Sequence, residues 1–139
     1  FLAQRLASIP LTIVGNGKQT RDFIHVSDLV NAVLKAAYSK NTGKIYNLAG
    51  GKEIQVNKIA RLIGGKTVNI PKRPGEPDRS LGDIKKIKKD LNWKPKVKIE
   101  NGVEDLLRNI KSFKNAPIWT PKKIKKATKS WFKLLKKRK

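Results

Sequence analysis

The sequence predicts an α/β fold, with a few strands of a parallel sheet, a small mixed α/β lobe and a basic C-terminal helix. Short β-branched runs alternate along the chain with helical patterns of apolar residues, as in sheets covered by helices. Glycine or proline marks most of the boundaries between these segments. Hydrophobic residues make up 38% of the chain, enough to build a core although the formal net charge is +23.

The composition also excludes several classes of site. The chain has 139 residues and no cysteine, so it is one modest domain without disulfides, thiol nucleophiles or thiolate-bound zinc. The single histidine, His25, argues against a multi-histidine metal site, and we interpret it as a packing or capping residue. No apolar run approaches the roughly 18 residues of a membrane span. The sequence begins at Phe1 rather than Met, and we expect it to be part of a longer polypeptide.

The first quarter of the chain contains two helices and two extended segments. Residues 1–8 have apolar side chains at helical spacing, and a proline follows. Residues 11–14 form a short β-branched strand that ends in a Gly-Asn-Gly turn. We expect a second extended segment at 22–26. A helix then begins at Ser27, whose side chain would cap it, with apolar residues repeating at intervals of three and four.

The middle of the chain predicts a strand–helix–strand unit. Residues 44–49 have apolar side chains on both faces, as in a buried parallel strand, and a Gly-Gly pair follows. An amphipathic helix is expected over 54–63 and a strand over 67–70. Residues 71–77 contain three prolines and a glycine and predict a loop.

The last part of the chain predicts three helices. Asp83 begins one that ends near Leu91, and residues 100–113 form the next. Residues 117–121 are a proline-bounded link to the last helix, 122–137. Its apolar stripe consists of Ile124, Ala127, Trp131, Leu134 and Leu135.

That last helix leaves two interpretations open. Ten basic residues and no acid lie between Pro121 and Lys139. A helix of this kind can act as a binding module for nucleic acid or for an anionic membrane surface. We favour the alternative in which it folds back over its own domain, because Trp119 between two prolines is typical of a packed segment.

Two arginine-bearing segments carry the chemical information. The run from Gly15 to Leu29 places Arg21 at a loop–strand junction beside a glycine turn, where a guanidinium suits bidentate capture of phosphate. The proline-rich loop that follows residue 70 holds Arg73 and Arg79 in a defined geometry.

With these two segments, the sequence resembles the C-terminal part of the NAD-dependent epimerase/dehydratase family, the extended short-chain dehydrogenases that act on nucleotide-diphosphate sugars. The resemblance covers residues 1–119, and UDP-glucose 4-epimerase-like members fit best, with 4,6-dehydratases and decarboxylases close behind. It rests on four stretches in order, namely Pro-Leu-Thr-Ile-Val-Gly at 10–15, Gln-Thr-Arg-Asp-Phe-Ile-His-Val at 19–26, Tyr-Asn-Leu-Ala-Gly at 46–50, and Arg-Pro-Gly-Glu at 73–76 with Gly-Asp-Ile and Leu-Asn-Trp after it.

The resemblance implies a Rossmann-type sheet and a nucleotide-sugar site. Residues 1–116 would be the C-terminal substrate-binding portion, and 117–139 a basic helical extension. In such a site Arg21 and Arg73 would clamp the diphosphate from opposite sides. The other positions that the family pattern assigns to substrate are Thr12, Ile13 and Val14 around the base, and Gly75 and Glu76 beside the phosphate and ribose.

Two family motifs do not occur in the sequence. There is no Gly-x-x-Gly-x-x-Gly turn for NAD, and Tyr38 and Tyr46 are followed four residues on by Thr42 and Gly50 instead of lysine. We therefore assign no catalytic, cofactor-binding or metal-binding residue, and expect the chain alone to be inactive. By the resemblance, NAD would be bound by an N-terminal part, the full-length protein would be a possible homodimer, and its localisation cytoplasmic.

Overall fold

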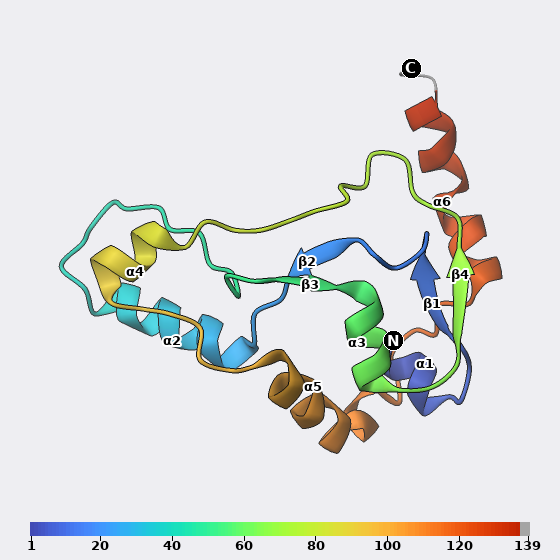
Figure 1. The fold of residues 1–139 in the computed structure, drawn as a ribbon, viewed down its shortest axis with the longest axis horizontal. Helices are drawn as coiled ribbons and strands as arrows, with labels where there is room; N and C mark the ends of the chain where they lie inside the picture. The colour runs from blue at the N-terminus through green and yellow to red at the C-terminus, as the bar shows by residue number, and fades with distance from the viewer. Residues whose placement is uncertain (137–139) are drawn as a thin grey trace.

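The computed structural model describes residues 1–136, which form two helix-bearing clusters joined by several segments of the chain (Figure 1). One cluster contains strands β1 (Leu11–Val14) and β4 (Thr67–Ile70). The other contains helices α2 (Val26–Ala37) and α4 (Lys85–Leu91). Between the clusters, β2 (Thr20–Asp22) pairs antiparallel with β3 (Glu53–Gln55).

The strand pair β1–β4 is parallel, which confirms the α/β prediction and the parallel pairing. The hydrophobic core lies on one face of this pair, where α1 (Leu2–Leu6), α3 (Val56–Ile63) and α5 (Ile99–Arg108) pack. Side chains alternate along β1, so Leu11 and Ile13 are buried whereas Thr12 and Val14 lie half-buried on the opposite face. The buried residues of this core are Leu11, Ile13, Ile59, Ala60, Ile63 and Val103.

The second cluster forms around Trp93, which is 2% exposed. Its indole Nε1 donates to the backbone oxygen of Asp28 at 3.2 Å. The Asp28 carboxylate is itself buried and accepts from the backbone nitrogens of Lys96 and Val97, at 3.0 and 2.9 Å. Asp28 therefore fixes the course of the chain after Trp93 against the first turn of α2.

The predicted strand at 44–49 is wrong. These residues have no strand ladder, and Ile45 is 84% exposed. A strand requires a neighbour for its backbone groups. Within residues 1–136, the four strands pair only as β1–β4 and β2–β3, so this segment has no ladder partner.

The segment around His25 differs from the prediction by a few residues. The extended piece expected at 22–26 is instead β2, which ends at Asp22, and α2 begins at Val26. The N-cap is His25 rather than Ser27, because the His25 Nδ1 accepts from the Ser27 backbone nitrogen at 3.4 Å and lies 2.7 Å from its Oγ. The capping role expected for the histidine is confirmed.

The other predicted helices also differ from the structure at their boundaries. The helix expected from residue 54 begins at Val56, after β3. Asp83 lies before α4 and accepts from the Lys85 backbone nitrogen at 2.8 Å, and α4 starts at Lys85. The helix expected over 100–113 ends as α-helix at Arg108 and continues as the 3-10 turn η1 (Ile110–Phe113).

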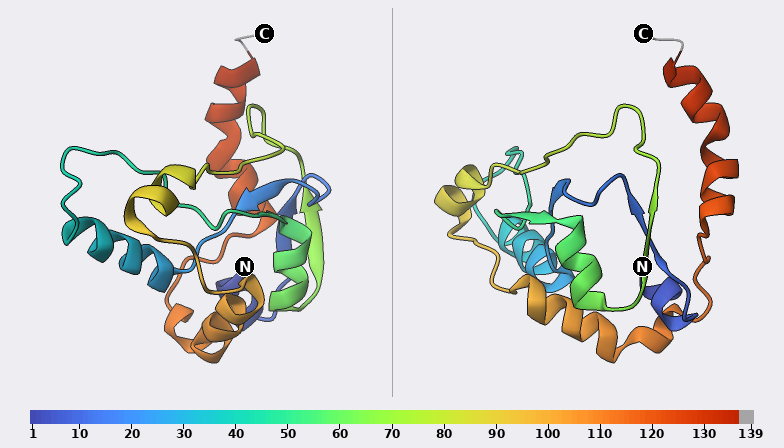
Figure 2. Two further views of the ribbon diagram at one scale, coloured as in Figure 1. Left: turned by 60° about the vertical axis from the view of Figure 1, so that its left-hand side comes forward. Right: turned by 45° about the vertical axis from the view of Figure 1, so that its right-hand side comes forward.

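Helix α6 (Pro121–Lys136) stands beside the β1–β4 pair, with its far end extending beyond the rest of the molecule (Figure 2). The predicted end of this helix, residue 137, lies outside the described residues. The preceding link is fixed by Gln4, which is 3% exposed and donates to the Trp119 oxygen at 2.7 Å and to the Thr12 hydroxyl at 3.0 Å. Across residues 1–136, no helix has both the length and the apolar character needed to cross a bilayer.

Candidate functional site

The loop after β4 contains a rigid turn formed by Arg73, Pro74, Gly75 and Glu76. The Glu76 backbone nitrogen donates to the Arg73 oxygen at 3.3 Å, and Gly75 has φ +76°. Proline at the second position and a positive φ at the third are the features of a type II β-turn. The Arg-Pro-Gly-Glu sequence thereby holds the two charged residues on either side of one fixed turn.

Arg21, from β2, reaches this turn. Its Nη2 donates to Glu76 Oε1 at 2.8 Å, and its Nη1 donates to the backbone oxygens of Thr20 and Pro77 at 2.7 and 3.0 Å. Both charged side chains are about three-quarters buried. The Arg21 Nε and one Nη2 hydrogen remain available, because a guanidinium has five N–H donors.

A second ion pair anchors the end of the same loop. Arg79 donates from Nε and Nη2 to the two carboxylate oxygens of Glu53, at 2.9 and 2.6 Å, and Thr20 donates to Glu53 Oε1 at 2.8 Å. The bonds from Arg79, and then the one from Thr20, lower the pKa of Glu53 from 4.5 to about 2. The carboxylate therefore stays charged throughout the neutral and mildly acidic range.

The turn after β1 is held on the N-terminus of α3. The backbone nitrogens of Val56 and Asn57 donate to the oxygens of Gln19 and Gly17, both at 3.0 Å. A side chain at Gly17, where φ is +71°, would collide with Asn57, which explains the glycine. This turn and the loop after β4 therefore both have fixed positions.

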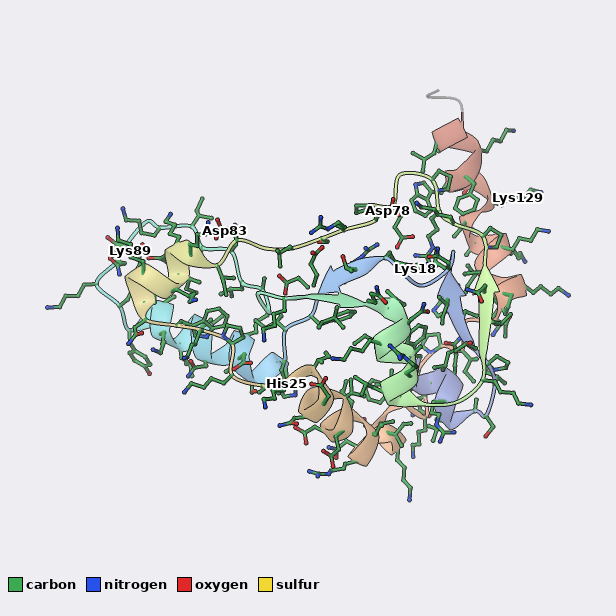
Figure 3. All side chains as sticks on the ribbon, in the orientation of Figure 1. Lys18, His25, Asp78, Asp83, Lys89 and Lys129 are labelled. Carbon is green, nitrogen blue, oxygen red and sulfur yellow. The ribbon has the colours of Figure 1, made fainter. Side chains whose placement is uncertain are left out.

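Between the two loops lies a cavity of about 590 Å³. Figure 3 shows Lys18 and Asp78 on the two loops that border it. Lysine and arginine side chains outnumber carboxylates in its lining, which favours an anion. The charged residues that line it are Lys18, Lys72, Glu76, Asp78 and Arg79.

Two buried polar atoms flank the type II turn. Among the described residues, Arg73 Nε and Glu76 Oε2 have no hydrogen-bond partner. Buried polar atoms in proteins are nearly always paired, so an unpaired donor and an unpaired acceptor on one turn need an explanation. A ligand group that accepts from Arg73 Nε, and one that donates to Glu76 Oε2, would satisfy these two atoms.

The site residues expected from the sequence are distributed over two neighbouring cavities. Val14 and Glu76 line the 590 Å³ cavity, whereas Thr12 and Arg73 line a second cavity, of about 440 Å³, on the side of α6. Ile13 is 4% exposed in the core, so any contact from it to a ligand would come from its backbone. Arg21 and Arg73 do not line one common cavity here, and the diphosphate clamp stays a prediction.

Sequence reasoning did not select Lys18, Lys72 or Asp78, which also line the 590 Å³ cavity. Each lies within two residues of a quoted motif, so proximity to those motifs was the available signal. Lys72 and Asp78 form an exposed ion pair at 2.6 Å.

The tyrosines do not form the acid/base pair of a dehydrogenase. Tyr38 is 87% exposed, and the Tyr46 hydroxyl donates to Asp90 at 3.2 Å. Desolvation, and then this bond to Asp90, raise the pKa of Tyr46, opposite to what a tyrosine base requires. The described residues also contain no cluster of three or more His, Cys, Asp or Glu side chains that could hold a metal ion.

Comparison with known proteins gives a consistent picture. The family model of GDP-mannose 4,6 dehydratase matches residues 2–106. UDP-glucuronic acid decarboxylase 2 of Arabidopsis thaliana is 33% identical over 117 residues, which are 80% of this chain and 26% of that protein.

Two solved structures share the fold at 29% identity. UDP-glucuronic acid 4-epimerase from Bacillus cereus, in complex with UDP-glucuronic acid and NAD, has a TM-score of 0.74 over 81% of this chain and 38% of its own. UDP-glucose 4-epimerase from Thermotoga maritima, with UDP-glucose, has a TM-score of 0.71 over 80% of this chain and 38% of its own. This chain thus spans about a quarter of the curated relative and about two-fifths of the solved structures.

Proposed function

Because this chain belongs to the GDP-mannose 4,6 dehydratase family of NAD-dependent epimerases and dehydratases, we propose that it is the nucleotide-diphosphate-sugar-binding part of such an enzyme. The proposed substrate is a UDP-sugar and the proposed reaction type is that of a 4-epimerase. The relatives that support this choice are described as acting on, or are complexed with, UDP-glucose or UDP-glucuronic acid.

The observation that carries this proposal is the pair of unpaired buried atoms at the type II turn. Arg73 Nε can donate to a phosphate oxygen, and Glu76 Oε2 can accept from a ribose hydroxyl. A nucleoside diphosphate carries both groups within a few bonds of one another.

Arg21 would supply the second contact to the diphosphate. Its pairing with Glu76 fixes the guanidinium and leaves two N–H groups free toward the ligand. Charge-assisted bonds of this kind contribute about 1.5–3 kcal/mol each. Lys18, which also lines the 590 Å³ cavity, would add attraction at longer range.

The described residues do not fit a dinucleotide. Helices α2, α3 and α5 begin after His25, Gln55 and Lys98, none of which ends a glycine-rich turn of the kind that receives a pyrophosphate. We therefore propose that NAD and the catalytic tyrosine and lysine belong to a separate dinucleotide-binding part, and derive no step of the reaction through the cofactor.

The exposed face of α2 would dock this dinucleotide-binding part. Val26, Val33 and Leu34 are 67%, 53% and 48% exposed on one helix, an uncommon apolar surface for a soluble domain. The extended segment 44–49, which has no ladder partner among the described residues, lies in the same cluster. A sheet that docks on α2 could accept this segment as an added strand.

Calorimetric titration of the chain with UDP-glucose and UDP-glucuronic acid tests the proposal. We expect saturable binding that weakens about 10- to 100-fold in Arg21→Ala and in Arg73→Ala, from the loss of one charge-assisted bond each. The matched control is Arg108→Ala, because Arg108 is an exposed partner of Glu104 on α5. Equal losses in all three variants, or no saturable binding, would contradict the proposal.

A further inference from the structure

Helix α6 follows the region that the family model matches, which ends at residue 106, and its charge is one-sided. Each turn of the helix carries lysine, and no acidic residue occurs from Pro121 to its end. Figure 3 shows Lys129 on α6, at the edge of the molecule. The lysines whose side chains are described are Lys122, Lys123, Lys125, Lys126, Lys129 and Lys133.

The opposite side of α6 is apolar and aromatic. At 100° per residue, Ile124, Trp131 and Leu135 fall within about 40° of one another, and Leu134 and Phe132 flank them. This side is only partly covered, because Trp131 is 42% and Leu134 66% exposed. A large apolar side chain left this exposed indicates an interaction surface when several occur together.

The helix is held to the body at its base and loosely along its length. Gln4 fixes the Trp119 backbone, and Thr120 caps the first turn through its hydroxyl, 3.3 Å from the Lys123 nitrogen. Farther along, cavities of about 440 and 950 Å³ lie between α6 and the body. The apolar side of α6 is therefore incompletely packed against the rest of the chain, and few van der Waals contacts are lost if it moves to another apolar surface.

We propose that α6 binds an anionic membrane surface, lying in the plane of the headgroups with its apolar side in the acyl boundary. Lysines on one side and tryptophan, phenylalanine and leucine on the other are the features of interfacial helices. A nucleic acid would be held by the lysines, with base stacking on Trp131, and would leave the aliphatic Leu134 in water. The exposed apolar side chains therefore favour lipid over nucleic acid.

Vesicle co-sedimentation with the intact chain tests this proposal. Vesicles of phosphatidylcholine alone are compared with vesicles containing one-third phosphatidylglycerol. The charge variant is Lys126→Gln/Lys129→Gln/Lys133→Gln, and the matched control is Lys85→Gln/Lys88→Gln/Lys89→Gln, which removes the same charge from α4. The apolar variant is Leu134→Ser, at a position exposed enough to leave the fold intact.

We expect binding only to the anionic vesicles, weaker by about 100-fold in the α6 charge variant and by about tenfold in Leu134→Ser. The α4 variant should keep most of the affinity. The tryptophan emission should shift to the blue when vesicles are added, because Trp131 would enter a less polar environment.

The proposal is overturned if anionic vesicles bind no better than neutral ones, or if the α4 and α6 charge variants lose equally. It is also overturned if Leu134→Ser has no effect while single-stranded RNA competes for the helix, since the lysines would then serve nucleic acid. UDP-sugar titration of the α6 variants keeps this test separate from the proposed function, because their affinity for UDP-sugar should be unchanged.

Discussion

Arg21 and Glu76 lie 55 residues apart in the sequence and form an ion pair with 2.8 Å between Nη2 and Oε1. The pair joins two of the four segments that carry the family pattern, the one around β2 and the loop after β4. The two carboxylate oxygens of Glu76 therefore differ: Oε1 accepts from Arg21, and Oε2 is buried without a partner among the described residues.

The coupling between these two residues can be measured directly. A double-mutant cycle with Arg21→Met and Glu76→Gln should give about 1–2 kcal/mol of coupling in the free energy of urea unfolding, because the pair is mostly buried. The equivalent cycle for the exposed pair Arg108–Glu104 should give at most about 0.5 kcal/mol. Similar couplings in the two cycles would show that burial does not strengthen the Arg21 pair.

Asp28→Ala should destabilise the second cluster. The substitution removes the acceptor of the part-buried Lys96 and Val97 backbone nitrogens, at a cost of about 1–3 kcal/mol in the free energy of unfolding. Urea unfolding followed by tryptophan fluorescence measures this loss in a Trp119→Phe/Trp131→Phe background, which leaves Trp93 as the reporter. Asp105→Ala, at an exposed position on α5, is the control and should change the free energy by less than about 0.5 kcal/mol.

Gly75→Ala should affect both stability and ligand binding. A Cβ at φ +76° costs about 1–2 kcal/mol, and relief of that strain would distort the turn that holds Arg73 and Glu76. Gly43→Ala has the same backbone cost at φ +64°, with nothing within 4 Å of the added atom. Both variants should lose stability in urea, but only Gly75→Ala should weaken UDP-sugar binding. If the Gly75→Ala and Gly43→Ala variants bound UDP-sugar equally well, the turn at Gly75 would not be part of the binding site.

Stability should fall with acid through Glu53. Its pKa is about 2 in the folded chain, below the ordinary value of 4.5, so the pair with Arg79 stabilises the fold above pH 4.5 and is lost as the pH falls from 4.5 to 2. Glu53→Gln should therefore be less stable than the wild type at pH 6, with the difference disappearing by pH 2. The urea midpoints of the wild type and of Glu53→Gln, measured from pH 6 to pH 2, test this prediction. If the difference between the two midpoints did not change with pH, the charge of Glu53 would not be its cause.

The apolar face of α2 should make the chain self-associate when no other polypeptide covers it. Val33→Lys places a charge in the middle of this face, where the valine is 53% exposed, and should lower the weight-average mass in sedimentation experiments. Leu106→Lys, at a 40% exposed position on α5, is the control and should leave the mass unchanged. A monomeric wild-type chain would contradict the prediction.

Much of the fold follows from local patterns. The apolar repeat of α3 and the β-branched run of β1 correctly predicted a helix and a strand, because each pattern has one face that must be buried. The capping role of His25 was also predicted. The strand at 44–49 was not borne out, since its residues favour extended structure but the described chain provides no partner for their backbone groups.

For the candidate site, the motifs selected two segments that border the 590 Å³ cavity but gave no information on their geometry. Arg21 and Glu76 were both selected, yet nothing in the sequence indicated that they pair. Ile13 was predicted beside the base with its neighbours, and alternation along β1 puts its side chain in the core, which leaves its backbone groups for any such contact.

Spacing along the chain was sufficient to predict the family, the order of most elements and the residues worth testing. The pairing of Glu76 with Arg21, the position of Arg73 beside α6 and the absence of a strand at 44–49 became clear only from the three-dimensional arrangement. Those outcomes depend on which groups meet across tens of residues, where the geometry of packing and the pairing of buried polar atoms determine the arrangement.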